Sequence, residues 1–182
     1  MFGWLKQKGA KSPAPAEPQP HVPLPKHDEN GRPIRPTIPG LSHAEKATTE
    51  QKLLALEWAR EWSGHGSMPE SAEDLLPHLD RVLGGRPMRG KDPLSPVVSG
   101  ACRALSLAAQ DNRAERVQKL LPWVELRLGP QEHHCQAAMQ LANRLVPFVD
   151  RPHIPLPGCD EPICGCWLRQ TTKAEADKRN SA

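Results

Sequence analysis

The sequence lacks several features that would assign it to a familiar class. No run of apolar residues is long enough to span a bilayer, and residues 1–6 lack the apolar core of a secretory signal peptide. The 24 basic residues exceed the 21 acidic residues by only three, which is too small an excess to indicate a nucleic-acid-binding protein. These absences predict a cytoplasmic protein, from a bacterium, for which nucleic acid is not indicated as a partner.

Motifs of catalysis are also missing. The glycine-rich loop that ends in Lys91 lacks the Gly-Lys-Ser/Thr of a phosphate-binding loop, because Asp92 follows the lysine. No spacing of serine, histidine and aspartate indicates a nucleophile with its base, and carboxylates such as Glu57 and Glu115 are scattered over solvated helix faces. The sequence therefore favours a non-enzymatic protein, although it leaves an enzyme open.

Residues 1–40 are predicted to form a disordered, proline-rich arm. Nine of the 21 prolines fall between Pro13 and Pro39, and apolar residues there are too sparse to form a core. The first residues differ, because apolar side chains precede lysines in a pattern that could contact a membrane surface or a protein partner. A solvated tail is the simpler interpretation, since a few apolar residues anchor weakly. The candidate interaction residues are Phe2, Trp4, Leu5, Lys6 and Lys8.

Residues 41–150 show a helical pattern of apolar residues. Ser42 and Glu45 resemble a capping box, which predicts a helix over 43–62, and Ser71 is a candidate cap for a second helix. Ser95-Pro96 predicts the start of a third and strongly amphipathic helix. Asp111-Asn112 is expected to end that helix, and Gly129-Pro130 to open the last one. No alternating stretch is interpreted as a strand.

The predicted fold class is therefore all-α, with about five helices in a small orthogonal bundle. Four segments are expected along the chain. They are the disordered arm (1–40), the helical domain (41–150), an irregular Cys-rich tail (151–170) and a disordered charged end (171–182).

The Cys-rich tail contains three of the five cysteines of the chain, Cys159, Cys164 and Cys166. They lie among prolines and glycines, in a segment unsuited to a helix or a central strand. Clustered thiols in a reducing compartment indicate metal binding or thiol redox chemistry rather than a disulfide framework. Gly158 could adopt the left-handed backbone that a tight turn around an ion requires.

The first interpretation is a structural zinc site. A closed tetrahedral site needs four ligands, and His153 is the nearest candidate to complete the three cysteines. If the tail folds back onto the last predicted helix, His133, His134 or Cys135 could take its place. Zinc is favoured over an iron–sulfur cluster because three thiolates with a histidine form a common structural zinc set. Metal binding would then fold a tail that is poor in apolar residues.

The second interpretation is thiol redox chemistry. Cys164 and Cys166 are one residue apart, so a disulfide between them would be strained and oxidising, and Cys159 could act as the resolving thiol. The neighbouring Asp160 and Glu161 argue against this, because nearby negative charge raises the pKa of a thiol. Thiols without a ligand are the third interpretation.

The run from Pro155 to Cys166 resembles the C-terminal signature of a group of small uncharacterised proteobacterial proteins. These proteins end in a Leu-Pro-Gly-Cys-Asp run, a Cys-x-Cys pair and a basic tail that contains an aromatic residue. This chain departs from the signature where Leu168 replaces the expected aromatic and Trp167 stands next to the last cysteine. The resemblance covers none of the helical part, and it implies a motif but no activity.

These observations predict a small non-enzymatic protein whose zinc-binding tail acts in protein interaction or regulation, with a protein partner. A thiol redox protein or sensor is the first alternative. An adaptor that acts through residues 1–11 at a partner or a membrane surface is the second, and the membrane surface is the less favoured of these targets.

Overall fold

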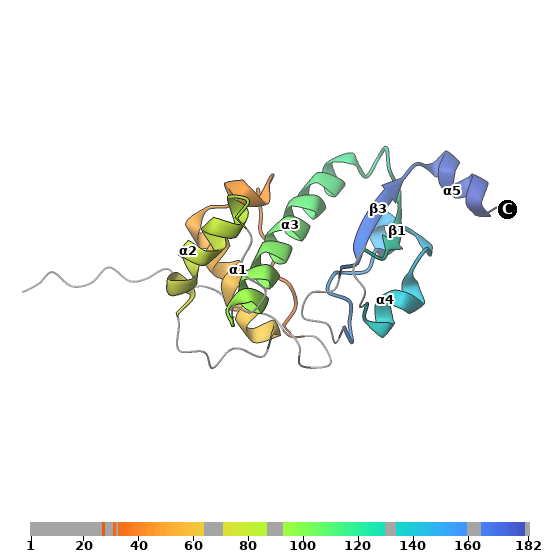
Figure 1. The fold of residues 1–182 in the computed structure, drawn as a ribbon. Helices are drawn as coiled ribbons and strands as arrows, with labels where there is room; N and C mark the ends of the chain where they lie inside the picture. Colours follow the sequence, from red (N-terminus) through yellow and green to blue (C-terminus); the bar gives the residue numbers. More distant parts are fainter. Residues whose placement is uncertain are drawn as a thin grey trace, which may run out of the picture.

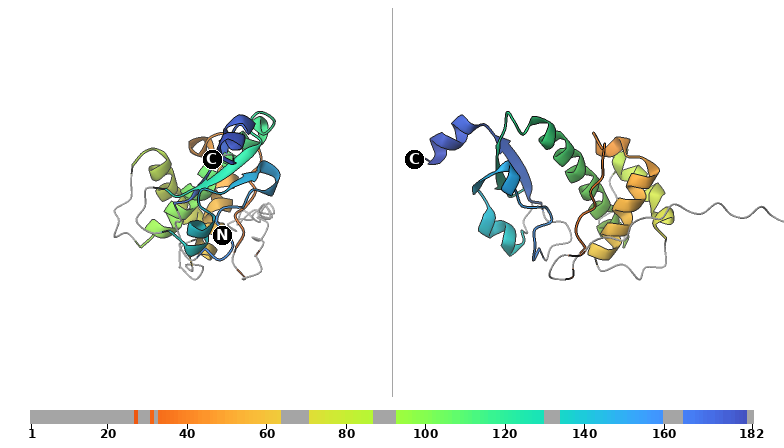
Figure 2. Two further views of the ribbon diagram at one scale, coloured as in Figure 1. Left: turned by 90° about the vertical axis from the view of Figure 1, so that its right-hand side faces the viewer. Right: turned by 180° about the vertical axis from the view of Figure 1, so that it is seen from behind.

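The structure is a computed structural model. The residues that it describes are 27, 31, 33–63, 71–86, 93–129, 134–159 and 165–180. The predicted interaction residues Phe2, Trp4, Leu5, Lys6 and Lys8 lie outside these ranges, as does Cys164. The described chain forms two parts, which we call the helical half and the sheet half. The long helix α3 (Ser95–Val117) passes between them and packs against both (Figures 1 and 2).

The helical half contains the 3₁₀ turn η1 (Ala44–Lys46), α1 (Thr49–Trp62), α2 (Ala72–Leu83) and most of α3. Its core consists of fully buried aliphatic side chains from all three helices, together with Ile38 and Leu41 from the preceding segment. At Gly100 of α3, an added Cβ would lie 3.2 Å from the Cβ of Ala59. Small residues therefore allow α1 and α3 to approach closely, because any larger side chain would separate their backbones.

Local capping interactions set where the first two helices begin. Thr48 caps α1 in a capping box with Gln51, so the helix predicted over 43–62 begins only at Thr49. Ser42 lies before the short 3₁₀ turn η1 and Glu45 lies within it. The predicted cap of the second helix is confirmed, since the Ser71 hydroxyl accepts the backbone N–H of Asp74 at 3.2 Å. Each side chain thus satisfies a backbone donor that has no partner within its own helix.

Helix α3 does not end at Asp111-Asn112 as the sequence predicted. The Asn112 amide donates to the carbonyl oxygens of Ala108, 2.9 Å away, and of Ile38, 3.0 Å away, and Asp111 pairs with Arg35. Both polar side chains contact the segment before α1, and the second Asn112 bond goes to a carbonyl oxygen four residues earlier in the same helix, which leaves the helical backbone intact. The helix therefore continues to Val117 and reaches the sheet half.

The prediction of an all-α fold is wrong, because the chain contains a three-stranded antiparallel sheet in the order β2-β1-β3. Its strands are β1 (Trp123–Arg127), β2 (Leu145–Pro147) and β3 (Trp167–Thr171). Pro122 lies after the turn that follows α3, and Val124 and Leu126 then alternate with polar or amphipathic residues, which is the period of a strand. Glu125 pairs with Leu145 on one side and with Arg169 on the other.

The remaining elements also differ from the predicted pattern. The last predicted helix is reduced to α4 (Gln136–Leu141), and its continuation instead forms β2 and the 3₁₀ turn η2 (Phe148–Asp150). β3 adds regular structure to the tail that was expected to be irregular, and α5 (Lys173–Asn180) lies in the segment expected to be a disordered end. In the views of Figures 1 and 2, α5 extends beyond the sheet. No helix in the described parts of the chain is long and apolar enough to cross a membrane.

Candidate functional site

Three cysteines from separate segments lie in the small core of the sheet half. Cys135 is 1% exposed, and Cys159 and Cys166 are fully buried. Leu107 of α3 and Leu126 of β1 belong to the same buried cluster, which therefore joins the sheet half to the long helix. We call Cys135, Cys159 and Cys166 the thiol cluster.

The backbone around each thiol is ordered by local hydrogen bonds. Cys135 precedes α4, and its Sγ accepts the backbone N–H of Ala138 at 3.3 Å. The N–H of Cys159 donates to the carbonyl oxygen of Leu156 at 2.9 Å, which closes a tight turn. Gly158 occupies the left-handed position in this turn with φ = 73°, as the sequence predicted. The bond from the Ala138 N–H fixes the Cys135 sulfur at the start of α4.

The start of β3 is held against two other segments. The Arg103 guanidinium on α3 donates to the carbonyl oxygen of Cys166. Gly129, just after β1, contacts Gly165 so closely that a Cβ on Gly129 would lie 2.4 Å from the Gly165 oxygen. Since both contacts involve backbone atoms, the position of Cys166 depends on packing at this crossing and not only on its own side chain.

The structure brings together only part of the predicted ligand set. Cys159 and Cys166 lie in the thiol cluster, whereas His153 is exposed and lines a cleft. Cys164 lies outside the described residues. Among the residues that are described, no three histidine, cysteine, aspartate or glutamate side chains form a group that could hold a metal ion.

His134, an alternative ligand in the sequence analysis, and Cys102 do not belong to the thiol cluster. His134 is half-buried, and its Nδ1 is buried with no hydrogen-bond partner in the described structure. Cys102 packs against the core of the helical half instead, and burial raises the pKa of its thiol to about 11. Cys102 is therefore protonated at neutral pH and acts as a small apolar side chain.

A network of charged residues on the sheet was not anticipated from the sequence. Glu125 is fully buried, and its carboxylate lies 2.9 Å from Arg127 Nε and 2.7 Å from Arg179 Nη1. Arg169, directly opposite on β3, is 3.7 Å away and also pairs with Glu175 of α5 at 2.8 Å. The network attaches α5 to the central strand, because a buried carboxylate must be neutralised by nearby cations.

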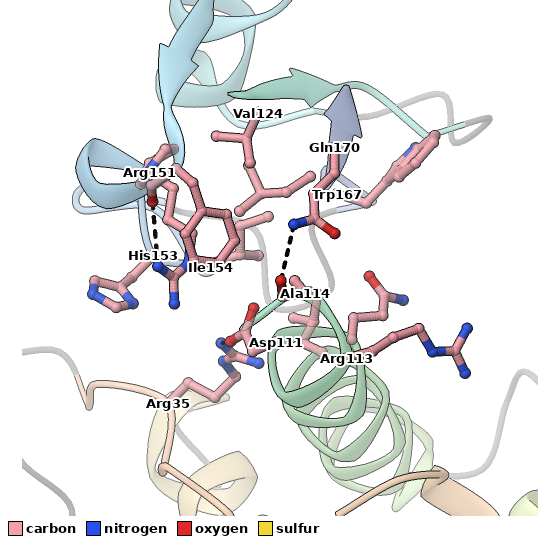
Figure 3. Close-up of a pocket in the computed structure, with 15 residues that line it drawn as sticks. Arg35, Asp111, Arg113, Ala114, Val124, Arg151, His153, Ile154, Trp167 and Gln170 are labelled. Carbon is pink, nitrogen blue, oxygen red and sulfur yellow. Dashed lines mark hydrogen bonds and ion pairs between the residues drawn. The ribbon is translucent and has the colours of Figure 1, made fainter. Parts of the chain in front are cut away.

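A cleft opens where α3, the segment 33–38 and the 151–157 loop meet (Figure 3). Two adjoining hollows, of about 330 and about 440 Å³, share several lining residues, among them Arg35, Asp111, Arg151 and His153. One wall is apolar and is formed by Val124, Phe148, Ile154, Trp167 and Leu168. Gln170 closes the end between β3 and α3 by donating to the Ala114 carbonyl oxygen at 3.1 Å.

Comparison of the chain with models of protein families, with curated proteins and with solved structures found no match. The thiol cluster and the cleft are therefore interpreted from their own geometry. The sequence pointed to two of the three clustered thiols, and it named Cys135 only as an alternative ligand. No local pattern in the sequence predicted the cleft, because its charged residues come from segments far apart in the chain.

Proposed function

We propose that this is a non-enzymatic protein that binds zinc through Cys135, Cys159, Cys164 and Cys166, in a reducing, cytoplasmic setting. The observation that supports this most is the burial of Cys135, Cys159 and Cys166 in one hydrophobic cluster. In the described structure these three do not by themselves form a group that could hold a metal, so the proposal requires Cys164 and a closer approach of the thiols when the ion binds. Zinc prefers four sulfur or nitrogen ligands in a closed tetrahedron at structural sites. Cys164 is proposed as the fourth ligand from its place in the sequence, two residues before Cys166.

The ligand set favours Cys135 over the histidine nearest in sequence. His153 is exposed and lines the cleft, whereas Cys135 is buried with the other two thiols. The N–H that reaches Cys135 Sγ is the type of outer contact that orients a metal ligand and stabilises its negative charge. The competing explanation is that Cys135 is a neutral thiol that packs as a small apolar side chain. Measuring the metal content of the protein distinguishes the two explanations.

A metal at this position would have a structural role. Four protein ligands leave no open coordination position, so the site would not activate a water molecule or a substrate. It would join the loop before β3, the start of β3 and the segment before α4, and so hold the sheet half in shape. We infer that the shaped surface serves a protein partner in interaction or regulation.

The redox alternative is less well supported. Disulfide exchange requires an accessible thiolate, and both Cys159 and Cys166 are fully buried. The adaptor alternative rests on Phe2, Trp4, Leu5, Lys6 and Lys8, outside the described residues, and it stays a prediction. Deleting residues 1–11 and following localisation tests it separately from the zinc site.

The decisive experiment is elemental analysis with native mass spectrometry on full-length protein without a His-tag. We expect about one zinc per chain, lost in Cys135→Ser, Cys159→Ser and Cys166→Ser. Cys102→Ser is the matched control, because it removes a half-buried thiol from the other core and should retain the metal. His153→Ala should also retain it.

Three outcomes would contradict the proposal. Metal-free wild-type protein that is fully folded would identify the thiols as core residues. A loss of two mass units on mild oxidation, without bound metal, would favour redox chemistry instead. Zinc that remains in Cys135→Ser but leaves in His153→Ala would restore the histidine as the fourth ligand.

A further inference from the structure

The cleft between the two halves contains a cation whose hydrogen bonding is incomplete. The Arg35 side chain is only 9% exposed, and it pairs with Asp111 through Nη2. Its other terminal nitrogen, Nη1, is buried and has no hydrogen-bond partner in the described structure. Such a group is costly, since a buried donor without an acceptor loses its hydration without replacement.

A second arginine reaches the same place from the opposite side. Figure 3 shows Arg151, from the loop after η2, facing Asp111 and Arg35 across the cleft, with His153 close by. The Arg151 guanidinium lies 4.0 Å from the centre of the Phe148 ring, and its pairing with Glu115 at 3.4 Å is loose. Arg151 Nη1 also donates to the Phe148 carbonyl oxygen at 3.3 Å, so the ring and this bond hold the guanidinium at the cleft. An arginine has five N–H groups, and those not used in these two bonds can donate to an incoming acceptor.

The charge around the cleft sets the charge of a suitable ligand. The hollow of about 330 Å³ is lined by three arginines, Arg35, Arg113 and Arg151, and by one carboxylate, Asp111. The excess of positive charge favours an anion. Arginine pairs with carboxylates in a planar two-bond geometry, which makes a carboxylate the anion best suited to these partners.

The apolar wall sets the rest of the ligand. Beyond the arginines, Val124 of β1 and Ile154 point into the hollow in Figure 3. Phe148 and Leu168 also line it. A volume of about 330 Å³ is at the small end of sites for organic ligands. The space therefore suits a compact apolar group and not an extended polymer.

We propose that this cleft binds a small organic carboxylate, whose anion pairs with Arg35 and Arg151 and whose apolar body lies against Val124, Phe148 and Ile154. The ligand would occupy the junction of α3 with the segment 33–38 and the 151–157 loop, so its binding would couple the two halves. None of the three clustered cysteines lines this site, but Ile154 belongs to the same buried cluster and Val124 to β1, so the titrations are made on protein that keeps its native metal content.

The test is isothermal titration calorimetry of full-length protein with benzoate and with 3-phenylpropanoate. Each is compared with the neutral alcohol of the same shape, benzyl alcohol or 3-phenylpropanol. We expect at least one carboxylate to bind with a dissociation constant below about 5 mM, and its alcohol to bind at least about tenfold more weakly. Phenyl phosphate is the comparison for another anion, and tighter binding of it than of both carboxylates would overturn the choice of ligand.

Two substitutions should change the affinity in opposite directions. Arg151→Gln should weaken binding about tenfold or more, because it removes a charged donor. Asp111→Asn should strengthen it about threefold or more, because a competing carboxylate beside Arg35 is lost. The control Arg116→Gln, on an exposed arginine of the same helix outside the cleft, should stay within about twofold, as expected for a screened surface charge.

Arg35→Gln should abolish binding, provided that circular dichroism shows native helix content. If that variant does not fold, Arg151→Gln and Asp111→Asn decide the question. The proposal is overturned if neither carboxylate binds at 10 mM, or if Arg151→Gln leaves the affinity unchanged.

Discussion

The helical half and the sheet half reach their stability by different means. The core of the helical half contains large aliphatic side chains and Trp58, all buried and drawn from three helices. The core of the sheet half is smaller, and three of its eight fully buried members are cysteines. Where apolar area is scarce, other interactions must supply stability, and here the candidates are a metal and the Glu125 ion network. The comparison sets a larger, mainly aliphatic core beside a smaller one that contains three buried thiols.

Removing zinc should produce the largest difference between the halves. With a strong chelator, backbone amides of β1, β2 and β3 should lose most of their hydrogen-exchange protection, while those of α1 and the first part of α3 keep theirs. Structural zinc contributes on the order of 10 kcal/mol in small zinc domains, and that contribution is carried by the segments that it joins. If the strands keep their hydrogen-exchange protection in a metal-free sample, the sheet half does not depend on zinc for its stability.

Truncating the apolar core should produce the next largest effect, located in the helical half. Leu56 is fully buried in α1, so Leu56→Ala should lower the free energy of unfolding by about 2–5 kcal/mol. Urea denaturation followed by circular dichroism measures this change. Leu120→Ala is the control, because that leucine is 75% exposed and its loss should cost less than about 0.5 kcal/mol.

Neutralising Glu125 should weaken the sheet half by a smaller amount. Glu125→Gln leaves Arg127, Arg169 and Arg179 without their shared counter-ion, but each of these arginines is about one-third exposed and stays partly hydrated. We expect a loss of about 1–3 kcal/mol, with faster amide exchange in α5 and β3 and little change in α1. The control Glu115→Gln removes an exposed partner, and an equal effect from it would contradict the role of burial.

The smallest effect should come from the cap of α2 in the helical half. The Ser71 hydroxyl and then its backbone N–H donate to Asp74 Oδ2, at 2.9 and 3.1 Å, and hold the pKa of Asp74 below its ordinary value. A carboxylate with a lowered pKa stabilises the fold above its ordinary pKa, and that contribution disappears as the pH falls through the lowered value. Ser71→Ala should cost about 1 kcal/mol at pH 7.

The pH dependence provides the check on this cap. The protection factors of the amides at the start of α2, which are corrected for the intrinsic pH dependence of exchange, should fall on acidification in the wild type, and the difference between the wild type and Asp74→Asn should shrink. A difference that stays constant from neutral to acidic pH would show that the Asp74 charge has no part in the cap.

Local patterns in the sequence predicted the helical half well. The sequence could predict where α2 and α3 begin, at Ser71 and at Ser95-Pro96, because a cap or a proline acts on backbone groups within three or four residues. The turn at Gly158 could be predicted for the same reason. The length of α3 could not be predicted, because the partners of Asp111 and Asn112 are Arg35 and the Ile38 carbonyl oxygen, more than 70 residues earlier.

The sheet half could be predicted only in part. The alternation of Val124 and Leu126 was a usable signal for β1, but its partners lie about twenty and about forty residues later, and strand pairing depends on such distant segments. Cys135 likewise lies 24 residues before Cys159 and 31 residues before Cys166. The sequence by itself determined the local elements and the presence of clustered thiols, because these follow from neighbouring residues. Only the tertiary structure decided that Cys135 joins the thiols, that His153 does not, and that the arginines meet in a cleft, because burial and charge pairing are properties of the assembled chain.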